Sequence, residues 1–275
     1  MCRVLGVKRT CYYGHQKRRQ AKGQESERIE LLDWIKKLAK NSGESYGNRR
    51  IKSALNALGY SIGRYKTRQL MKEAGVFVRY HKKYKATTNS NHKLPIFDNV
   101  LKRVFYAPKT NCVYVSDITY IATQEGWLYL AVVIDLYSRK VVGWSINSRM
   151  EASLVCDALK MAIWQRKPQV GFIVHSDRGA QYASKLYRNL LEKYQGVGSM
   201  SRKGNCWDNS VAESFFGSLK QERVQWRFYK TRDEAKQDIL NYITMFYNSV
   251  RLHSYLGYKS PNQFEMQTDK LVSAA

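Results

Sequence analysis

The sequence predicts an α/β protein, a mixed five-stranded sheet with flanking helices, preceded by a small all-helical basic region. Three observations support this prediction. The first third of the chain has helical hydrophobic periodicity, the middle holds three β-branched and aromatic runs in close succession, and the remainder alternates helix-like with strand-like segments. With 44% hydrophobic and 13% aromatic residues in a chain of 275, an extensive core can form.

The N-terminal region is predicted to be helical. "ESERIELLDWIKKLAK" places Ile29, Leu32, Ile35 and Leu38 on one face, with acids in the first turn and lysines in the last. "YGNRRIKSALNALGYSIGRYKTRQLMKEAGV" predicts two more helices joined at "LGYSIG", where Gly59 suits a helix end. The pattern is helix-turn-helix-like, and a plain basic helical hairpin fits it as well. The candidate DNA contacts here are Arg49, Arg50, Arg64, Lys66 and Arg68.

The charge distribution indicates a polyanionic partner. The chain carries 47 Lys and Arg against 22 Asp and Glu, for a net charge of +25. Residues 1–93 hold 23 of these bases and 6 of the acids, so two thirds of the net charge lies in one third of the chain. Nucleic acid is favoured over a ribosome-associated protein or a merely basic surface, because neutralising phosphates releases counterions. The change in charge falls in a polar segment that reads as a linker, residues 81–110.

The remaining elements follow in order along the chain. Strands are expected at 112–123, 127–138 and 139–147, a helix at about 151–165, a strand at 170–176, a helix near 181–194, a strand at 196–201, and long helices near 208–228 and 232–249. Short polar joins make the first three strands an antiparallel meander. Alternation of helix and strand after a meander predicts helices on both faces of the sheet.

Two aspartates occupy unusual positions in these strands. Asp117 lies inside an apolar strand, on the same face as Val113, Val115 and Ile121, where a lone carboxylate is costly unless it is paired or binds a metal. Asp177 ends the strand "GFIVHSD", at the kind of strand end where ligand sites form in α/β sheets. A hydrogen-bonded strand-end Asp and a helix N-cap are the respective structural alternatives.

A third acid, Glu213, lies on a predicted helix. On a helical wheel it falls with Gly217 and Lys220, opposite the apolar side of the helix, and Gly217 would allow a backbone to approach closely. A solvated helix face is the alternative. Asp135 at the end of the second strand competes for the site, but "IDLYSR" also reads as an ordinary strand-to-turn exit, which we favour.

Three carboxylates suit hard cations with oxygen ligands, Mg²⁺ or Mn²⁺. The five cysteines are scattered without a C-x-x-C pair, which argues against a disulfide framework and a cysteine zinc site. No apolar stretch is long enough to span a membrane, and no secretory signal is evident, so a cytoplasmic location is expected.

Four ordered motifs carry a resemblance to a known family: "VSDITYI", "HSDRGAQY", "SRKGNCWDNSVAESFFGSLKQE" and "YNSVRLHSYLGYKSPNQF". Thirty-five residues separate Asp177 from Glu213. Together these features resemble the second-frame (OrfB) product of the insertion-sequence-three family of bacterial transposases, in the DDE transposase and retroviral integrase superfamily. The resemblance covers nearly the whole chain. Tyr114 and Ser116 depart from residues common in the family, and neither is one of the acids.

The resemblance implies a ribonuclease H-like DDE core at residues 111–270 with C-terminal helices, after a DNA-binding region at 1–80. It also implies that Asp117, Asp177 and Glu213 bind the metal, with two ions, and that Lys220 contacts DNA near the cleaved end. The remaining implied contacts along that edge are Arg178, Gln181, Arg202, Lys203 and Asn205. The C-terminal motif contains Asn248, Arg251 and His253, for which packing is the alternative.

The expected function is therefore a DNA transposase that cleaves element ends and transfers the 3′-OH strand. A non-catalytic DNA-binding regulator of the element and a ribonuclease H-like nuclease remain as alternatives. Expected partners are double-stranded DNA, further copies of the chain in a synaptic complex, and the upstream-frame (OrfA) product or a fusion with it. The expected location is the bacterial cytoplasm, in association with the nucleoid.

Overall fold

The computed structural model describes residues 6, 8–79, 94–102, 104–202 and 209–273. The chain divides into two compact units, Met1–Tyr80 and His81–Ala275. Each unit has its own buried apolar residues, so each is held together by a separate core.

The first unit is a bundle of α1 (Arg9–Asn41), α2 (Asn48–Ala57) and α3 (Arg64–Glu73), which contact one another pairwise. Leu31 and Ile35 of α1, Ile51 and Leu55 of α2, and Leu70 of α3 are all buried. Gly59 follows α2 with φ +98, the left-handed conformation that favours glycine just past a helix end. The two expected helices and their glycine turn are confirmed.

The first helix differs from its prediction. α1 begins at Arg9, far ahead of residue 25, and has no acidic residue in its first turn. Its buried stripe is Leu31, Ile35 and Ala39, whereas Ile29 is 55% exposed. These three residues follow one another at intervals of four along one face. Extending a helix that already exists costs less than starting a new one, and no proline interrupts the sequence before residue 25.

The second unit contains one five-stranded sheet, in the order β3-β2-β1-β4-β5. Its strands are β1 (Val113–Thr123), β2 (Gly126–Asp135), β3 (Val141–Asn147), β4 (Ile173–Ser176) and β5 (Val197–Met200). β1, β2 and β3 form the predicted antiparallel meander, and β4 and β5 add in parallel. The mixed five-stranded sheet predicted from the sequence is confirmed.

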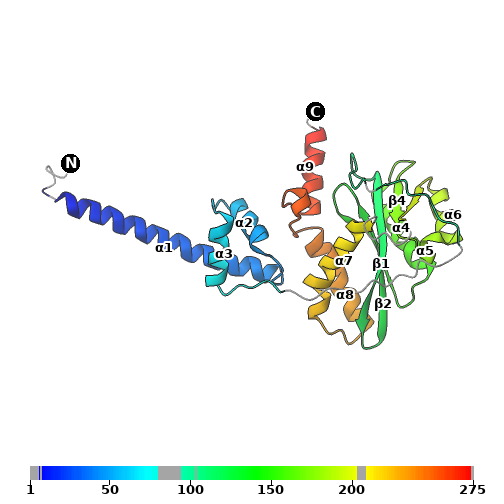
Figure 1. Cartoon of the computed structure of the whole chain (residues 1–275), viewed down its shortest axis with the longest axis horizontal. Coiled ribbons are helices and arrows are strands. Elements are labelled where there is room, and N and C mark those ends of the chain that lie inside the picture. The colour runs from blue at the N-terminus through cyan, green and yellow to red at the C-terminus, as the bar shows by residue number, and fades with distance from the viewer. Residues whose placement is uncertain (1–5, 7, 80–93, 103, 203–208, 274–275) are drawn as a thin grey trace. The chain divides into compact units, whose positions relative to one another are not determined.

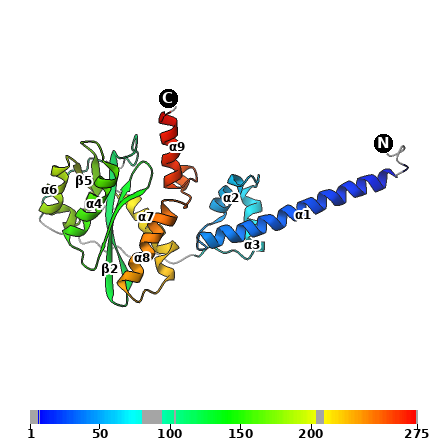
Figure 2. The same cartoon turned by 180° about the vertical axis from the view of Figure 1, so that it is seen from behind.

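Helices cover both faces of the sheet (Figures 1 and 2). α4 (Ala152–Arg166) packs on β2 and β3, with α5 (Ala180–Ala183) and α6 (Lys185–Lys193) beside it. α7 (Ser210–Glu222) and α8 (Arg232–Asn241) lie on the other face against β1. A Cβ on Gly143 of β3 would come within 2.2 Å of the Ala158 carbonyl oxygen, so glycine allows the close approach of α4.

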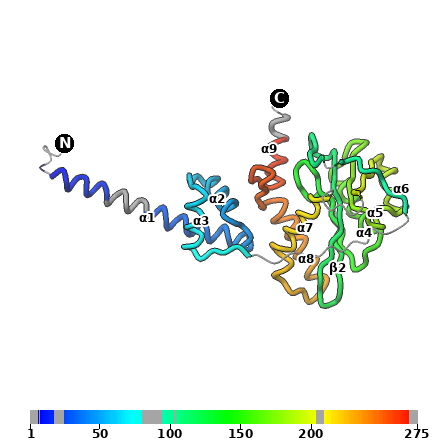
Figure 3. Tube along the Cα trace, viewed as in Figure 1, coloured from blue at the N-terminus to red at the C-terminus, as the bar shows by residue number. Residues whose placement is uncertain are grey.

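Three of the predicted helices are interrupted. The helix expected near 181–194 breaks at Ser184, whose hydroxyl accepts a hydrogen bond from the Tyr187 backbone N–H and so begins α6. After α7 a short 3-10 turn, Val224–Trp226, replaces the expected continuation. α8 continues as a π-helical segment, Tyr242–Tyr247, followed by a 3-10 turn at Ser254–Leu256 and by α9 (Pro261–Ser273). Figure 3 traces this path beside the sheet.

Part of the segment assigned to the linker packs on the edge strand β5. The backbone N–H groups of Val100 and Leu101 donate to Ser199 Oγ at 3.0 and 3.3 Å. The Phe97 ring lies where a Cβ on Gly198 would be, 2.7 Å away. An edge strand exposes unpaired backbone groups, and this segment covers them.

The C-terminal motif protects the opposite edge of the sheet. The Asn248 side chain donates to the Val141 carbonyl and accepts from the Val141 N–H, at 2.9 and 3.0 Å. Arg251 forms a buried ion pair with Glu222 at 2.8 Å and contacts His253. Packing, the alternative named for these motif residues, is therefore their role in this unit. Within the described residues, no helix is long and apolar enough to cross a membrane.

Candidate active site

The parallel pairing of β1 with β4 brings the two aspartates together. The observed register pairs Val113 with Ile173 and Val115 with His175. β4 ends at Ser176, and extending this register by two residues would bring Asp177 beside Asp117, at the spacing of about 4.8 Å between neighbouring strands. Because side chains alternate along a strand, both carboxylates belong to the same face as Val113 and Val115. Asp177, which directly follows β4, would therefore lie at the position that neighbours Asp117 in β1.

Each of these aspartates makes one hydrogen bond to a nearby backbone. Asp117 Oδ1 accepts from the Ile118 N–H at 2.8 Å. Asp177 Oδ1 accepts from the Gly179 N–H at 2.9 Å. Asp177 is not the N-cap of α5, because Gly179 holds that position without a side-chain cap. The alternative of a simple helix cap is therefore wrong for Asp177.

Glu213 comes to the site on α7. Ala212, Phe215 and Leu219 bury the opposite side of this helix, and the Asn209 side chain ties its start to the Ser116 carbonyl at 3.4 Å. The Glu213 side chain is exposed on one side, and the protein on its other side raises its pKa by desolvation. The arrangement of the apolar residues of α7 is as the helical wheel predicted.

The charges of these acids act on one another. Burial raises the pKa of Asp117 well above its usual value of 3.8, and the negative charges of Asp177 and Glu213 raise it further. The Ile118 N–H and the Lys220 ammonium oppose that shift. Asp177 and Glu213 are therefore near enough to Asp117 for their charges to act on it.

Lys220 is buried, so the alternative of a solvated helix face is wrong for this residue. It is 7% exposed, and its Nζ lies 5.0 Å from the centre of the Tyr120 ring. Burial lowers the pKa of Lys220 to about 8, while Asp117 raises it. Gly217, by contrast, has no described atom within 4 Å of where a Cβ would lie, so none of the described residues makes the close approach expected there.

The three acids fit a divalent cation by charge and by ligand type. Asp117 holds its negative charge at a cost, and a cation beside it would remove that cost. Carboxylate oxygens are the ligands that Mg²⁺ and Mn²⁺ prefer. Among the described residues, however, no three His, Cys, Asp or Glu side chains are assembled into a ligand set for one ion.

Comparison with known proteins identifies the family. The integrase core domain family matches residues 107–206 and, in a second part, 213–268, and an HTH-like domain matches residues 26–84. The chain is 41% identical over 266 residues to the transposase InsF for insertion sequence IS3A of Escherichia coli K12, covering 96% of this chain and 92% of that one. The chain belongs to the IS3 family of transposases. The resemblance drawn from the four motifs is confirmed.

A second relative and one solved structure extend the comparison. The insertion element IS600 uncharacterized 31 kDa protein of Shigella sonnei is 43% identical over 274 residues, 99% of this chain and all of that one. The intasome of simian T-cell lymphotropic virus, solved in complex with PP2A regulatory subunit B56 gamma, shares the fold with a TM-score of 0.50 at 14% identity. That match covers 84% of this chain and 74% of the viral one, and it agrees with the ribonuclease H-like integrase fold.

The protein is therefore a DNA transposase, a polynucleotidyl transferase that acts on DNA. The regulator and nuclease alternatives find no support among these relatives. Transposase activity accounts for the strongly basic composition of the chain, because its substrate is DNA.

The structure describes three of the five other residues that were predicted to contact DNA in the transposase core. Arg178 Nε donates to the Ser201 carbonyl at 2.6 Å, beside Asp177. Gln181 Nε2 donates to the Met150 carbonyl at 3.0 Å, which links α5 to the segment before α4. Arg202 is exposed. Two predicted contacts, Lys203 and Asn205, lie outside the described residues.

Asp135 is a structural residue, as the sequence favoured. It is fully buried, and it accepts hydrogen bonds from the backbone N–H groups of Asn111, Tyr137 and Ser138 at 2.7, 2.9 and 3.0 Å. Burial raises the pKa of Asp135, while these donors oppose the shift. Its bonds fix the turn between β2 and β3 and join it to the start of β1.

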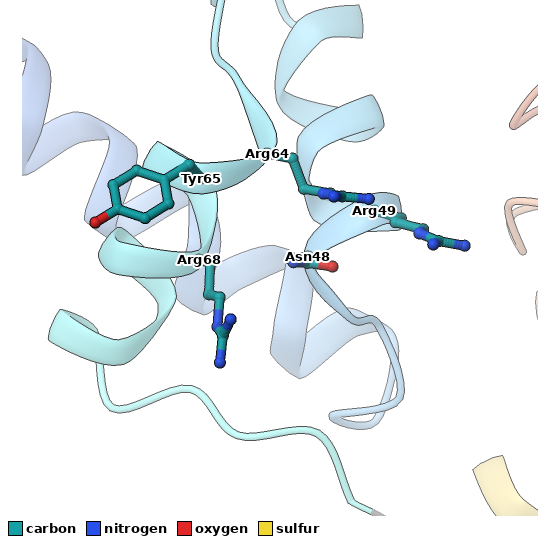
Figure 4. Close-up of a pocket in the computed structure, with 5 residues that line it drawn as sticks. All are labelled: Asn48, Arg49, Arg64, Tyr65 and Arg68. Atoms are coloured by element: carbon teal, nitrogen blue, oxygen red, sulfur yellow. The ribbon is translucent and has the colours of Figure 1, made fainter.

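The basic residues of the first unit divide between two surfaces. Arg49, Arg64 and Arg68 line one pocket of about 320 Å³ with Asn48 and Tyr65 (Figure 4). Lys66 lies instead in a groove between α1 and α3 that is lined by Glu25, Glu27 and Glu73. Arg50 lies over the Tyr46 ring at 5.4 Å. Lys66 and Arg50 therefore do not line the arginine pocket, although the sequence analysis named all five residues as candidate DNA contacts.

Tyr120 was missed by sequence reasoning. It stands three residues after Asp117 in "VSDITYI", and it holds the Lys220 ammonium over its ring. Strand periodicity places it on the opposite face from Asp117, so nothing local links it to the acids. The long-range contact with α7 makes that link.

Proposed function

We propose that this transposase cleaves one strand at each element end and joins the released 3′-OH to target DNA, with Asp117, Asp177 and Glu213 holding Mg²⁺ or Mn²⁺, two ions in the active complex. The observation that carries the proposal is that the negative charges of Asp177 and Glu213 both act on Asp117, just beyond the parallel pairing of β1 with β4. Such an accumulation of negative charge beside DNA is otherwise unfavourable, and divalent cations between acid and phosphate would make it favourable.

The reaction consists of two displacements at phosphorus. In the first, a water oxygen attacks the phosphodiester at the element end, the bond to the 3′ oxygen breaks, and that oxygen leaves as a 3′-OH. In the second, this 3′-OH attacks a target phosphodiester, a new phosphorus–oxygen bond forms, and the target 3′ oxygen leaves with a proton. Bound cations would lower the pKa of the attacking oxygen and stabilise the leaving one.

The chain itself positions the reacting groups. Asp117 lies in β1 and Asp177 directly follows the adjacent strand β4, so the sheet would set the separation of the two carboxylates. Lys220, held against Tyr120 and beside Asp117, would pair with a phosphate close to the cleaved bond. In-line geometry and charge neutralisation then supply the rate.

The arginine pocket of the first unit is the proposed duplex-binding surface. Arg49, Arg64 and Arg68 line this pocket from two helices, and their guanidinium groups suit DNA phosphates (Figure 4). Replacing Arg64 and Arg68 with Gln is expected to lower the salt slope of duplex binding by about two, one for each lost phosphate contact. Lys66→Gln is the matched control, because its groove is lined by acids, and an equal loss with this variant would contradict the assignment.

Synapsis of two element ends would require at least two copies of the chain, so we include a homo-oligomer in the active complex. The upstream-frame product, alone or as a fusion, is a further proposed partner, and the nucleoid of a bacterial cytoplasm is the proposed location. Both follow from the relationship to IS3-family transposases.

The test is incubation of the chain with labelled element ends, target DNA and Mg²⁺, with and without the upstream-frame product. Strand transfer that depends on Mg²⁺ and is lost in Asp117→Asn, Asp177→Asn and Glu213→Gln is expected. DNA binding by these variants should remain, because the arginine pocket is in the other unit. Transfer that persists in any one of the three variants would remove that residue from the site.

A further inference from the structure

An aromatic surface lies beside Lys220 on the hairpin of β1 and β2. Tyr120 and Trp127 meet edge to face, with ring centres 4.7 Å apart and an interplanar angle of 87°. Tyr120 also contacts the Lys220 ammonium. Trp127 is 51% exposed, so half of a large apolar side chain remains available to a ligand. The proposed roles of the three carboxylates make no use of either ring.

This surface extends away from the carboxylates along β1. Tyr120 stands three residues beyond Asp117, and Trp127 pairs with Ala122, five residues beyond it. At the rise of an extended strand these separations are about 10 and 17 Å. Lys220 connects the two regions, because its charge acts on Asp117 while its Nζ lies over the Tyr120 ring.

A second cation lies at the far end of the surface. Arg232 Nε donates to the Trp127 carbonyl at 3.3 Å, and its guanidinium reaches the hairpin turn at Gly126. Nearby Glu125 accepts a hydrogen bond from the Arg232 backbone N–H at 2.8 Å, so this acid is engaged by the start of α8. Lys220 thus contacts the Tyr120 ring, and Arg232 contacts the backbone at Trp127.

We propose that Tyr120 and Trp127 form a stacking surface for an unpaired base of the DNA end, with Lys220 and Arg232 holding the flanking phosphates. A base needs an open ring face to stack upon, and Trp127 offers one. The base lies about three to five nucleotides from the cleaved phosphate, if the strand keeps B-form spacing. The proposal takes its location from the catalytic role proposed for Asp117 and rests on it.

Single-stranded DNA is the occupant that the charges favour. A base within a duplex is covered on both faces by its neighbours, so only a frayed or displaced base could use the indole face. The two cations match the repeating phosphates of a strand. A second copy of this strongly basic chain would instead bring further positive charge to Lys220 and Arg232.

The test uses short DNA ends that carry the element's own terminal sequence, with the last nucleotides either paired or unpaired. Trp127→Ala is expected to bind the unpaired end at least about fivefold more weakly, with an unchanged salt slope, because stacking releases no counterions. Trp127→Phe should restore most of the binding. Arg232→Gln should lower the salt slope by about one.

Photo-cross-linking tests directly whether Trp127 contacts the DNA, and a purely structural role for Trp127 would give no cross-link. Iodouridine placed at successive positions near the end should cross-link to Trp127 within a narrow interval, in wild-type chain and in Asp117→Asn alike. Trp164→Ala is the matched control: Trp164 is 79% exposed on α4, whose Arg166 contacts Asn111 at the opposite end of β1. This variant should bind and cross-link as wild type does.

Two results would overturn the stacking surface. One is unchanged binding of the unpaired end by Trp127→Ala, and the other is a change in oligomeric state as its only effect. Either could occur while Asp117→Asn still abolishes strand transfer, which would leave the proposed function intact. Strand transfer by Asp117→Asn would instead remove the proposed function, whatever Trp127 contributes to binding.

Discussion

Two groups of carboxylates in the second unit differ in how their charge is balanced. Asp135 accepts three backbone hydrogen bonds, and Glu265 of α9 pairs with Arg166 at 2.6 Å and Lys140 at 3.0 Å. Asp117 accepts a backbone hydrogen bond from Ile118, and the negative charge of Asp177 raises its pKa. Both groups belong to the same unit.

The contrast in pKa is between Glu265 and Asp117, because burial raises the pKa of Asp135 as it does that of Asp117. Although burial opposes it, Arg166 and Lys140 hold the pKa of Glu265 below its usual value of 4.5. The pKa of Asp117 moves the other way, because burial and neighbouring acids disfavour its charge. An acid that costs stability when charged is suited to a cation that arrives with the substrate.

The largest expected effect follows from Asp117→Asn. Strand transfer should fall by more than about 100-fold, the upper range for residues that only support metal ligands. Without divalent cation, the melting temperature at neutral pH should rise by roughly 2–4 °C, as for 1 kcal/mol in a unit of this size. Mg²⁺ should stabilise wild type and leave the variant unchanged, as measured by thermal unfolding.

The expected rise in melting temperature follows from the number of protons that Asp117 binds in the folded and unfolded states. The raised pKa means that the folded state binds more protons than the unfolded state above pH 3.8, so this residue's contribution to stability falls as the pH rises toward the folded pKa. Asparagine removes that charge. A variant that is less stable than wild type at neutral pH without cation would show that Asp117 is a structural acid like Asp135.

Glu265→Gln should have the opposite pattern. Breaking a largely buried pair costs about 3 kcal/mol, because Arg166 and Lys140 lose the charge that they surround. Strand transfer per folded molecule should remain near wild type, since Glu265 pairs with residues outside the acid site. Denaturant unfolding measures the loss of stability, and the strand-transfer assay measures the activity that remains.

Lowering the pH should reduce the difference in stability between wild type and Glu265→Gln. Since the pKa of Glu265 is lowered, its stabilising contribution is present above pH 4.5 and is lost as the pH falls through the folded pKa. Wild type should therefore lose more stability than Glu265→Gln on acidification. Parallel losses in the two proteins would show that the ion pair carries no net stability.

A smaller effect is expected from Lys220. Its pKa of about 8 means that the free protein loses this positive charge as the pH rises past that value, so binding of DNA ends should weaken there. Lys220→Arg should remove this pH dependence, because a guanidinium stays charged. Lys220→Gln should lower the salt slope by about one, and an unchanged slope would argue against a phosphate contact.

The stability of the folded state should also depend on pH through Lys220. Between pH 8 and its usual pKa of 10.5, the unfolded chain binds more protons at Lys220 than the folded one, so the residue's contribution to stability rises with pH in that window. Thermal unfolding of wild type and Lys220→Gln across the window measures the difference.

The sequence by itself determined the elements and the candidate acids of this protein. Periodicity located the meander of β1, β2 and β3 and the apolar side of α7, since these patterns depend on neighbours a few residues apart. The four motifs identified the family, and an acid inside an apolar strand marked Asp117 as unusual. The turn at Asp135 was read correctly for the same local reason.

The tertiary structure alone decided which residues meet. The parallel register of β1 and β4, extended past Ser176, would bring Asp177 beside Asp117, and Lys220 turns inward to Tyr120 because α7 lies against β1. The separation of Lys66 from the arginine pocket likewise depends on how α3 packs on α1. Contacts between distant segments follow from the packing of whole elements, and no local pattern in the sequence encodes the register at which they meet.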